Sequence, residues 1–542
     1  MAKLINKTIG DLLDEITLNV NEHDAVIYPE LNIRWNYRDF LNYCNKLAKG
    51  LIKLGIKKGD HVAVWANNQP EWLITQFAVS KIGAVLVTIN TNYKAQELKY
   101  LLKQSDSKTI ILIDNSRNSV NLFDILLDIC PEIIDSSPGE LNSKCLPLLK
   151  NIVLLSDKKR PGVFSWKEIL KMGDCITDDE LISRQDSLLP DDIVNIQYTS
   201  GTTGLPKGVM LSHYNILNNA RSVAENMKLQ KHDKLCIPVP FFHCFGSVLG
   251  ILACVSVGAT MIPLVAFNPL KVLKVINNEK CTALHGVPTM FINILNHPEF
   301  NNYDTSSLRT GIIAGANCPV EIMNQIINKM GIKEITIAYG QTETSPVITQ
   351  TKIGDSIKAQ TQTVGTALPN VEVKIINPEN GEILPYGTPG ELCTRGYHIM
   401  KGYYNMPLAT EEVIDKNGWL HTGDLAIMDE YQYISITGRL KDMIIRGGEN
   451  VYPKEIEEIL YKHPDILDVQ VVGIPDVVYG EKVAAFIRVH KNKHITKEDL
   501  WGFCINKVSS FKIPELVYIV EKYPMTGNNK VRKDKLRKLL LK

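Results

Sequence analysis

The chain has 542 residues, a formal net charge of +1, and ordinary globular contents of hydrophobic (44%) and charged (22%) residues. This length suggests two to four domains with a large buried core, and the near-zero charge argues against a dedicated nucleic-acid-binding protein. Eleven cysteines are scattered from Cys44 to Cys504 without a CxxC pair, which indicates reduced, mostly buried thiols in a cytoplasmic protein with neither a zinc site nor a disulfide framework.

The first twenty-one residues contain three acidic side chains and lack an apolar core. They match neither a secretory signal nor an Arg-rich, acid-poor transit peptide. A first helix is predicted after Asn36, because apolar side chains follow at helical spacing up to Leu54 and Gly55 suits its end.

Strands and helices then alternate, which is typical of parallel β/α layers. Strands are predicted for residues 61–65, 84–89 and 109–113, and helices for residues 71–82 and 95–103. Residues 114–190 are less regular and contain turn-forming prolines and glycines, so we expect surface helices and loops without chemistry there.

Residues 198–208 combine glycines, hydroxyl side chains and a lysine directly after an apolar run. Glycines let backbone N–H groups approach an anion, hydroxyl groups add donors, and a lysine supplies a point charge suited to phosphate. We therefore interpret the segment as a phosphate-binding loop with the candidate residues Thr199, Ser200, Gly201, Thr202, Thr203, Gly204 and Lys207.

A Walker loop does not fit this segment. That motif places four residues between its glycines and a Lys-Ser/Thr pair after the second glycine. Here Gly201 and Gly204 are too close, and Pro206 disfavours a helix that begins at the lysine. A plain polar hairpin turn is the structural alternative, but it would not require this many hydroxyl groups.

The alternation continues beyond this loop. Residues 239–270 contain no Asp, Glu, Lys or Arg, but glycine and prolines interrupt them, and the densest apolar part is too short to cross a bilayer. We expect a buried helix and a core strand there rather than a transmembrane segment. Strands are predicted for residues 235–239, 260–264, 282–285, 310–314 and 334–338, and a helix for residues 270–278.

The residue pattern changes towards the C-terminus. Residues 364–428 form short strands punctuated by glycine and proline, which indicates a β-rich subdomain. Residues 438–442 mark a seam, after which helices and strands form a compact α+β unit. We predict an α/β fold with a large N-terminal domain of layered β/α subdomains (residues 1–438), a hinge (residues 439–441) and a small mobile C-terminal domain (residues 442–542).

Five further segments carry candidate chemistry. Several follow apolar strands, where α/β folds place ligand-binding loops. The segments are His243 amid aromatic residues, Gly315-Ala316-Asn317, Tyr339-Gly340-Gln341-Thr342-Glu343, His421-Thr422-Gly423-Asp424 with Arg439 downstream, and Pro524-Met525-Thr526-Gly527-Asn528-Asn529-Lys530.

In this order the segments resemble the motifs of the adenylate-forming superfamily, which includes acyl-CoA synthetases, aryl-CoA ligases, firefly luciferase and peptide-synthetase adenylation domains. The resemblance covers essentially the whole chain. It implies that the platform at Gly315 and Ala316 lies under adenine, that Tyr339 (followed by Gly340) stacks on it, that Thr342 contacts the α-phosphate and that Glu343 holds Mg²⁺.

The resemblance also assigns roles outside the adenine pocket. It implies that Asp424 accepts hydrogen bonds from both ribose hydroxyls, that Arg439 assists at the ribose or phosphate, and that His243 lies at the carboxylate end of an acyl pocket. Lys530 would bridge the acyl carboxylate and the α-phosphate, although Asn528 and Asn529 replace the family's Ser/Thr and Gly.

The family rotates its C-terminal domain between two half-reactions, and Lys441 occupies the hinge position. In the second pose the segment with Gly447 and Gly448 would face the active site, and Arg446 would contact a CoA phosphate. These expectations rest on the resemblance alone.

Residues 65–72 and 446–453 look most like medium-chain fatty acyl-CoA synthetases of the "acyl-CoA synthetase family member 2" type. The resemblance implies ATP, Mg²⁺ and CoA as cofactor and co-substrates, a carboxylic acid as substrate, and AMP and pyrophosphate as products. A free-standing enzyme that loads a carrier protein, an aryl-CoA ligase and a non-catalytic protein of this fold are the alternatives, and acyl length and a homodimeric state stay open.

Overall fold

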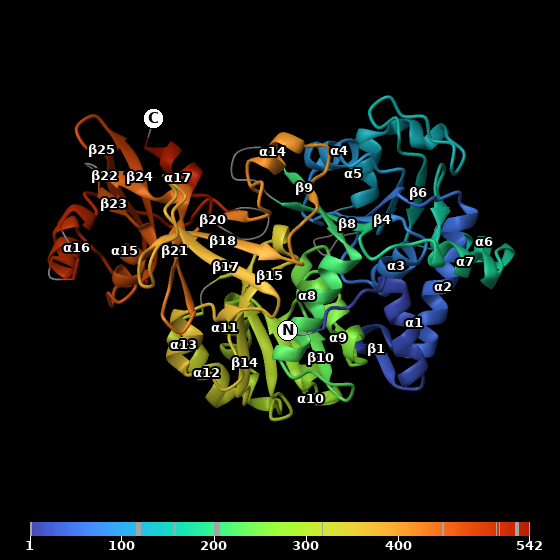
Figure 1. The fold of residues 1–542 in the computed structure, drawn as a ribbon, viewed down its shortest axis with the longest axis horizontal. Helices are drawn as coiled ribbons and strands as arrows, with labels where there is room; N and C mark the ends of the chain where they lie inside the picture. Colours follow the sequence, from blue (N-terminus) through green and yellow to red (C-terminus); the bar gives the residue numbers. More distant parts are fainter. Residues whose placement is uncertain are drawn as a thin grey trace. The chain divides into compact units, whose positions relative to one another are not determined.

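The computed structural model describes residues 3–114, 121–156, 159–199, 206–316, 318–446, 449–505, 507–508, 510–525 and 531–540. The chain forms two compact units: unit 1 consists of Met1–Glu372 and Thr394–Leu420, and unit 2 of Val373–Cys393 and His421–Lys542. Each unit mixes helices and strands, which confirms the predicted α/β class (Figure 1). The predicted hinge at residues 439–441 stays a prediction.

One sheet of unit 1 contains the two strands that flank the predicted phosphate loop. Its order is β19 (Gly402–Tyr403), β9 (Lys207–Ser212), β8 (Ile193–Thr199), β4 (Val85–Thr88), β3 (His61–Trp65), β5 (Thr109–Leu112), β6 (Asn151–Leu154) and β7 (Phe164–Ser165). In this spatial order, all strands from β8 through β4, β3, β5 and β6 to β7 run parallel to one another, whereas β9 is antiparallel to both its neighbours. Helices cover both faces of such a sheet, and β3, β4 and β5 are accordingly buried throughout.

The second sheet of unit 1 brings the predicted adenine segments to one edge. Its order is β16 (Thr366–Ala367), β15 (Val347–Gln350), β14 (Glu334–Gly340), β13 (Thr310–Ala314), β12 (Ala283–Gly286), β10 (Lys234–Ile237), β11 (Thr260–Pro263), β1 (Asp24–Tyr28) and β2 (Ile33–Asn36). The strands from β14 to β1 are parallel. The loops that follow them therefore leave from the same edge of the sheet.

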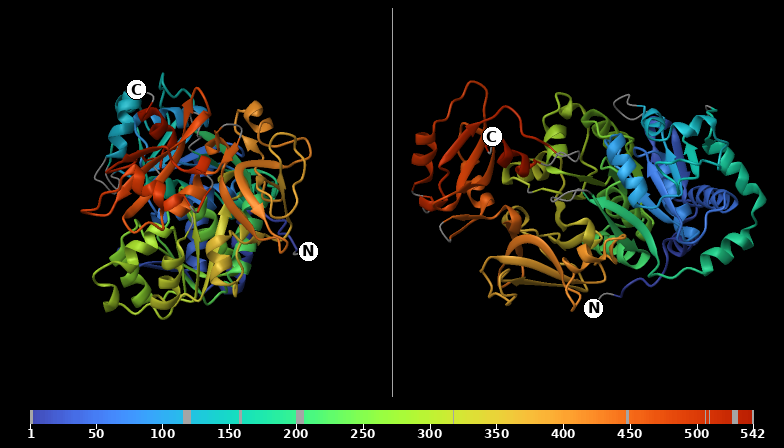
Figure 2. Two further views of the ribbon diagram at one scale, coloured as in Figure 1. Left: turned by 90° about the vertical axis from the view of Figure 1, so that its left-hand side faces the viewer. Right: turned by 90° about the horizontal axis from the view of Figure 1, so that it is seen from above.

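Helices flank these two sheets (Figures 1 and 2). The helix α3 is buried on every side except at Glu71 and packs against α1 and α2, and it buries polar side chains such as Gln76 and Lys81 together with its apolar ones. The helices of unit 1 are α1 (Ile9–Val20), α2 (Tyr37–Lys53), α3 (Pro70–Lys81), α4 (Ala95–Gln104), α5 (Leu122–Ile129), α6 (Trp166–Met172), α7 (Asp178–Asp186), α8 (His213–Asn226), α9 (Ala253–Val257), α10 (Pro269–Glu279), α11 (Pro288–Leu295), α12 (Val320–Lys329), α13 (Ile357–Gln362) and α14 (Pro407–Glu411).

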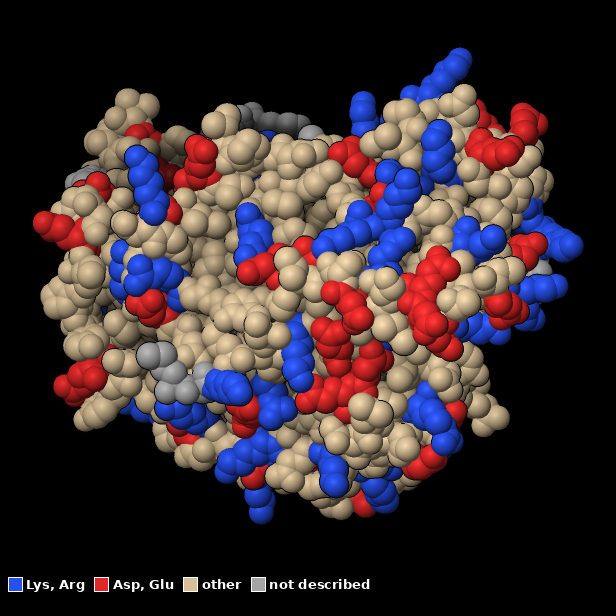
Figure 3. All heavy atoms as spheres, turned by 45° about the vertical axis from the view of Figure 1, so that its right-hand side comes forward, with Lys and Arg blue, Asp and Glu red and all other residues tan. Residues whose placement is uncertain are grey.

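The apolar stretch at residues 239–270 folds as predicted, into a buried helix followed by a core strand. A π-helical segment, η4 (Phe245–Leu252), continues into α9 and is followed by β11. Among the described residues no helix has both the length and the apolar character needed to cross a membrane. On the face drawn in Figure 3, basic and acidic side chains are interspersed, as the near-zero net charge leads one to expect.

Unit 2 contains two further sheets. One has the order β17 (Val371–Ile376), β18 (Gly390–Gly396), β20 (Leu420–Met428) and β21 (Ile434–Arg439), the first three strands extending beyond the bounds of the unit. The other has the order β23 (Glu449–Val451), β22 (Ile444–Arg446), β25 (Gly480–Val489) and β24 (Ile466–Asp476), and β26 (Leu516–Ile519) also pairs with β25. Its helices are α15 (Pro453–Leu460), α16 (Lys497–Cys504) and α17 (Lys533–Leu539).

The basic C-terminal tail is only partly solvated. The high positive charge of residues 530–542 predicts a solvated helix, but Leu536 of α17 is fully buried in a cluster with Val472, Phe486 and Tyr523. The helix is therefore amphipathic, with one apolar face that anchors the end of the chain to β24 and β25.

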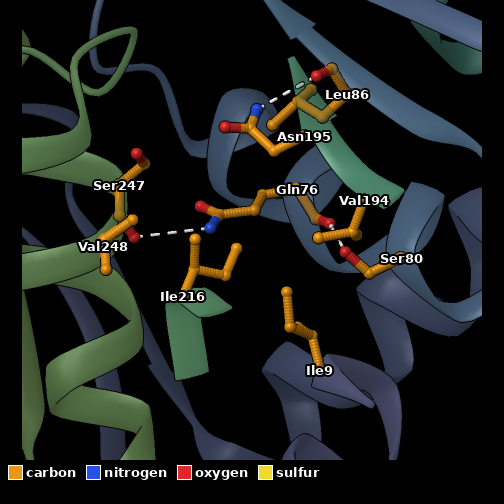
Figure 4. A pocket seen from close by; sticks show the side chains of 9 residues that line it. All are labelled: Ile9, Gln76, Ser80, Leu86, Val194, Asn195, Ile216, Ser247 and Val248. Atoms are coloured by element: carbon orange, nitrogen blue, oxygen red, sulfur yellow. Dashed lines mark hydrogen bonds between the residues drawn. The ribbon is translucent and has the colours of Figure 1, made fainter. Parts of the chain in front are cut away.

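A small internal cavity of about 10 Å³ lies between the layers of unit 1. It has room for about one water molecule. Two amide oxygens beside it, Gln76 Oε1 and Asn195 Oδ1, have no hydrogen-bond partner among the described residues. The cavity is too small for a nucleotide or an acyl chain, and the side chains that line it, shown in Figure 4, are Ile9, Gln76, Ser80, Leu86, Val194, Asn195, Ile216, Ser247 and Val248.

Candidate active site

The predicted phosphate loop connects two antiparallel strands of unit 1. Thr199 at the end of β8 pairs with Lys207 at the start of β9, so the two ends of the loop are held together. A strand rather than a helix follows the lysine, which agrees with the exclusion of a Walker loop. The predicted residues Ser200, Gly201, Thr202, Thr203 and Gly204 lie outside the described residues.

Tyr403 links the phosphate-loop lysine to the predicted metal ligand. It lies on β19, paired with Val209 of β9, and its ring is 4.7 Å from Lys207 Nζ. Its hydroxyl donates a 2.8 Å hydrogen bond to Glu343 Oε1. Burial, followed by the charge of Glu343, raises the pKa of Tyr403 well above its usual value, so the phenol stays protonated and acts as a donor.

The predicted adenine segments lie side by side. Ala314 of β13 pairs with Ala338 of β14, so Gly315 and Ala316 leave the sheet next to Tyr339. Gly315 has a φ of +84°, which favours glycine. A Cβ atom on Gly340 would lie 1.9 Å from the carbonyl oxygen of Pro346, so only glycine fits there.

Thr342 and Glu343 follow in the 3₁₀ turn η6 (Thr342–Thr344). Glu343 is 9% exposed, and its backbone carbonyl accepts a hydrogen bond from Met400 N. One carboxylate oxygen accepts from Tyr403, which orients the group and leaves Oε2 for another partner. A single oriented carboxylate fits Mg²⁺, which in nucleotide sites binds through one or two carboxylates, phosphates and water.

His243 is exposed at the start of the segment that leads into η4. Its Nδ1 accepts a hydrogen bond from Phe245 N at 3.1 Å, so the neutral ring carries its proton on Nε2. Next to it, Cys244 Sγ lies 4.0 Å from Thr342 Oγ1. The histidine segment and the Thr342 turn are therefore neighbours in unit 1, which sequence order did not reveal.

Unit 2 contains the predicted ribose and hinge residues. Asp424 on β20 pairs with Arg439 on β21, and Arg439 Nε lies 3.0 Å from Asp424 Oδ1. Asp424 is 6% exposed, whereas Arg439 is largely exposed. Lys441 follows in the short 3₁₀ turn η7 (Leu440–Asp442) and is exposed.

The predicted CoA contact Arg446 already has protein partners within unit 2. Its guanidinium donates a 2.6 Å hydrogen bond to the carbonyl of Phe511, pairs with Glu515, and lies 5.1 Å from the ring of Tyr479. A CoA phosphate would have to share or replace the Glu515 partner. The glycines at 447 and 448 lie outside the described residues.

Lys530 also lies outside the described residues, together with residues 526–529. The described residues on either side of this segment pair with each other: Met525 and Val531 form an antiparallel bridge, and Arg532 N donates to Pro524 O at 2.7 Å.

Comparison with known proteins places the chain in a family. Residues 16–404 match the model of the AMP-binding enzyme family, and residues 455–530 match the model of the AMP-binding enzyme C-terminal domain. YngI of Bacillus subtilis (strain 168), named provisionally as an acyl-CoA synthetase, is 54% identical over 537 residues, covering 99% of this chain and 98% of that protein. The human mitochondrial medium-chain acyl-CoA ligase ACSF2 is 40% identical over 542 residues, covering 98% of this chain and 88% of that protein.

Solved structures show the same fold over almost the full length. ATP-bound MatB from Rhodopseudomonas palustris superposes with a TM-score of 0.84 at 26% identity, covering 99% of both chains. A Mycobacterium tuberculosis fatty acyl CoA synthetase superposes with a TM-score of 0.74 at 28% identity, covering 98% of both chains. The chain therefore belongs to the AMP-binding enzyme family.

Proposed function

We propose that the protein is an ATP-dependent fatty acid–CoA ligase that acts in two steps. In the first, a carboxylate oxygen of the acid attacks the α-phosphorus of ATP, and pyrophosphate leaves with the electrons of the broken P–O bond. In the second, the CoA thiol loses its proton and attacks the acyl carbon, and AMP leaves. Adenylation is needed because a carboxylate has no good leaving group.

The observation that supports this proposal best is the chain of contacts from Lys207 through Tyr403 to Glu343. It places a cation and an oriented carboxylate around one buried phenol, beside the edge of β14 that carries Tyr339. Such an arrangement suits a triphosphate with its metal, because each phosphate group needs positive charge nearby. The names of the relatives support an acyl acid and CoA as the other substrates.

Individual roles follow from the described geometry and the family pattern. Thr199, Lys207 and Thr342 would bind phosphate oxygens, Gly315, Ala316 and Tyr339 would hold adenine, and Asp424 and Arg439 would hold the ribose. Glu343 would hold Mg²⁺, which when bound neutralises phosphate charge. His243 would orient the acid, and its Nε2–H is the donor suited to a carboxylate.

The test is product analysis with purified protein, Mg²⁺-ATP and CoA, across straight-chain acids of two to eighteen carbons plus benzoate and cinnamate. Release of AMP with formation of a fatty acyl-CoA, best with medium to long chains, would support the proposal. Release of ADP, or no nucleotide turnover with any acid, would reject it. Pyrophosphate exchange without thioester formation on free CoA would favour the carrier-protein alternative, and a preference for the aromatic acids would favour an aryl-CoA ligase.

The cellular setting is also a proposal. All eleven cysteines are free, which supports the reducing environment of the cytoplasm, and fractionation of cells would test it. A homodimer is the assembly to test by light scattering.

A further inference from the structure

Three metal-ligating side chains of unit 2 converge outside the residues assigned above. Glu391 and Cys393 alternate along β18 and therefore lie on one face of the sheet, and His421 lies at the start of the neighbouring strand β20. His421 Nδ1 is 2.9 Å from Glu391 Oε2 and 3.6 Å from Cys393 Sγ. In the part of the chain that the structure describes, this is the one such group whose donor atoms all lie within 4.8 Å of one another.

The separations approach those of a tetrahedral transition-metal site. With metal–sulfur and metal–nitrogen bonds of about 2.3 and 2.0 Å, sulfur and nitrogen ligands stand about 3.5 Å apart. The Nδ1–Sγ distance of 3.6 Å already matches this, and the Nδ1–Oε2 contact would have to lengthen by a few tenths of an ångström. Two of the three donor separations are therefore already close to those around a bound ion, and the third pair, Glu391 and Cys393, lies within 4.8 Å.

The donor set selects the kind of metal. A thiolate, an imidazole and a carboxylate together suit Zn²⁺ or Co²⁺ and do not suit Mg²⁺, which prefers oxygen. Glu391 and Cys393 are buried, whereas the side chain of His421 is 33% exposed, so an ion and a fourth ligand such as water can enter from the histidine side. Glu391 Oε1 accepts a hydrogen bond from Gly423 N at 3.1 Å, which holds the carboxylate in place.

We propose that Glu391, Cys393 and His421 bind one Zn²⁺-class ion and that this ion weakens nucleotide binding. Binding replaces the proton of the Cys393 thiol, and any proton on His421 Nδ1, with the metal. Glu391 accepts a hydrogen bond from Gly423 N, and His421 lies three residues before Asp424 on β20, so an ion that repositions these two ligands would also shift Asp424. The binding site stands independently of the proposed ligase activity, whereas the effect on ATP rests on it. The absence of a CxxC pattern hid this site, because its ligands come from two strands.

The experiment is a Co²⁺ titration of the metal-free full-length protein in a reductant that does not bind metals. We expect a thiolate-to-cobalt absorption band that saturates at one ion per chain and is competed away by Zn²⁺. Cys393→Ser should abolish the band, and the matched control Cys175→Ser, which removes an exposed cysteine, should keep it. A wild-type protein without the band, or a Cys393→Ser protein with it, would overturn the site.

Two additions keep the test decisive. If Cys393→Ser does not fold, Glu391→Gln should still weaken Co²⁺ binding at least about tenfold, since loss of an outer-sphere partner alone has that effect; unchanged affinity would overturn the site. The proposed effect on nucleotide binding is tested by enzyme kinetics: saturating Zn²⁺ should raise the KM for ATP several-fold in the wild type and in Cys175→Ser but not in Cys393→Ser. An equal rise of the KM for ATP in all three proteins would reject the proposed effect of the ion on Asp424. The existence of the metal site is tested separately, by the Co²⁺ titration.

Discussion

Tyr403 and Glu343 are sixty residues apart in the chain, and the tyrosine hydroxyl donates a 2.8 Å hydrogen bond to the glutamate carboxylate. Both side chains are buried, so water cannot replace a lost donor. The same tyrosine ring lies against Lys207. Tyr403 is thus a positioning residue between the phosphate loop and the carboxylate proposed for Mg²⁺.

Tyr403→Phe keeps the ring beside Lys207 and removes only the hydrogen bond. Because a hydrogen bond to a charged group contributes about 1.5–3 kcal/mol, we expect kcat/KM for ATP to fall about tenfold to a hundredfold. We also expect the enzyme to need more Mg²⁺, a change that a purely structural defect would not produce. Steady-state kinetics with varied Mg²⁺ measures both.

The control for this variant is Tyr404→Phe, whose hydroxyl bonds to Asp106 instead. Tyr404→Phe should keep the Mg²⁺ requirement of the wild type. If both variants lost the same activity with an unchanged Mg²⁺ dependence, Tyr403 would have no specific link to Glu343.

The Tyr403–Glu343 contact illustrates what the sequence could not predict. Strands β3 and β13 were predicted with their observed bounds, because each is a largely apolar run between turn signals. Tyr403 carries no comparable local signal, since its role arises from the pairing of β19 with β9. A contact between two segments that lie far apart in the sequence can be predicted only when the fold that brings them together is known.

Helix α8 was missed for a different reason. It buries Asn215, Asn218 and Asn219, which breaks the apolar periodicity that predicts a helix. Their amides bond to backbone groups of distant segments, for example Asn215 to the carbonyl of Tyr397 and Asn219 to that of Val347. These tertiary hydrogen bonds offset the cost of burying the polar face of the helix, whereas the sequence alone suggests a solvent-exposed segment.

Strand β6 was missed because its four residues lie in an otherwise irregular stretch.

The cysteines should differ sharply in reactivity. Burial raises the pKa of Cys244 to about 12, the nearby charge of Glu343 adding to the effect, so at pH 8 its thiol stays protonated. Cys175 is exposed. We expect iodoacetamide at pH 8 to alkylate Cys175 at least about a hundredfold faster than Cys244 in the folded protein, as read by peptide mass spectrometry.

Unfolding in guanidinium should bring the two alkylation rates close together, which controls for intrinsic differences. Rapid alkylation of Cys244 in the folded protein would mean that its segment beside His243 opens to solvent.

Acid should destabilise unit 1 through His213. This histidine is fully buried, accepts a hydrogen bond from Ile9 N at 3.0 Å, and burial lowers its pKa to about 4. The unfolded chain takes up the proton first, so the stability is fully present above the unfolded pKa of about 6.5 and is lost as the pH falls towards 4. At pH 5 the loss amounts to about 2 kcal/mol.

His213→Asn tests this, because asparagine can accept the Ile9 hydrogen bond without titrating. We expect a smaller drop in Tm between pH 7 and pH 5 than in the wild type. His494→Asn, at an exposed position, should keep the wild-type pH dependence. Identical pH profiles for His213→Asn and the wild type would exclude this histidine as a cause.

Gly340 should tolerate no side chain. Its Cβ atom would meet the backbone of Pro346 at 1.9 Å, and backbone cannot move aside as a flexible side chain can. We expect Gly340→Ala to lower Tm and to abolish most AMP formation by displacing Tyr339 and Thr342. Gly502 lies in α16 with open space around it, so Gly502→Ala should instead stabilise by about 0.5–1 kcal/mol. Wild-type stability and activity in Gly340→Ala would contradict the close packing.

Lys530 should matter for only one of the two half-reactions. Its proposed role is to neutralise charge between the acyl carboxylate and the α-phosphate, a demand that ends once the acyl-adenylate has formed. Lys530→Ala should therefore reduce adenylation about a hundredfold to a thousandfold and leave thioester formation from supplied acyl-adenylate near the wild-type rate. The exposed Lys535 offers a control in the same basic tail, and Lys535→Ala should keep both rates. An equal fall in both half-reactions of Lys530→Ala would assign the lysine to folding or to general nucleotide binding instead, since a group that acts only on the first transition state cannot slow the second.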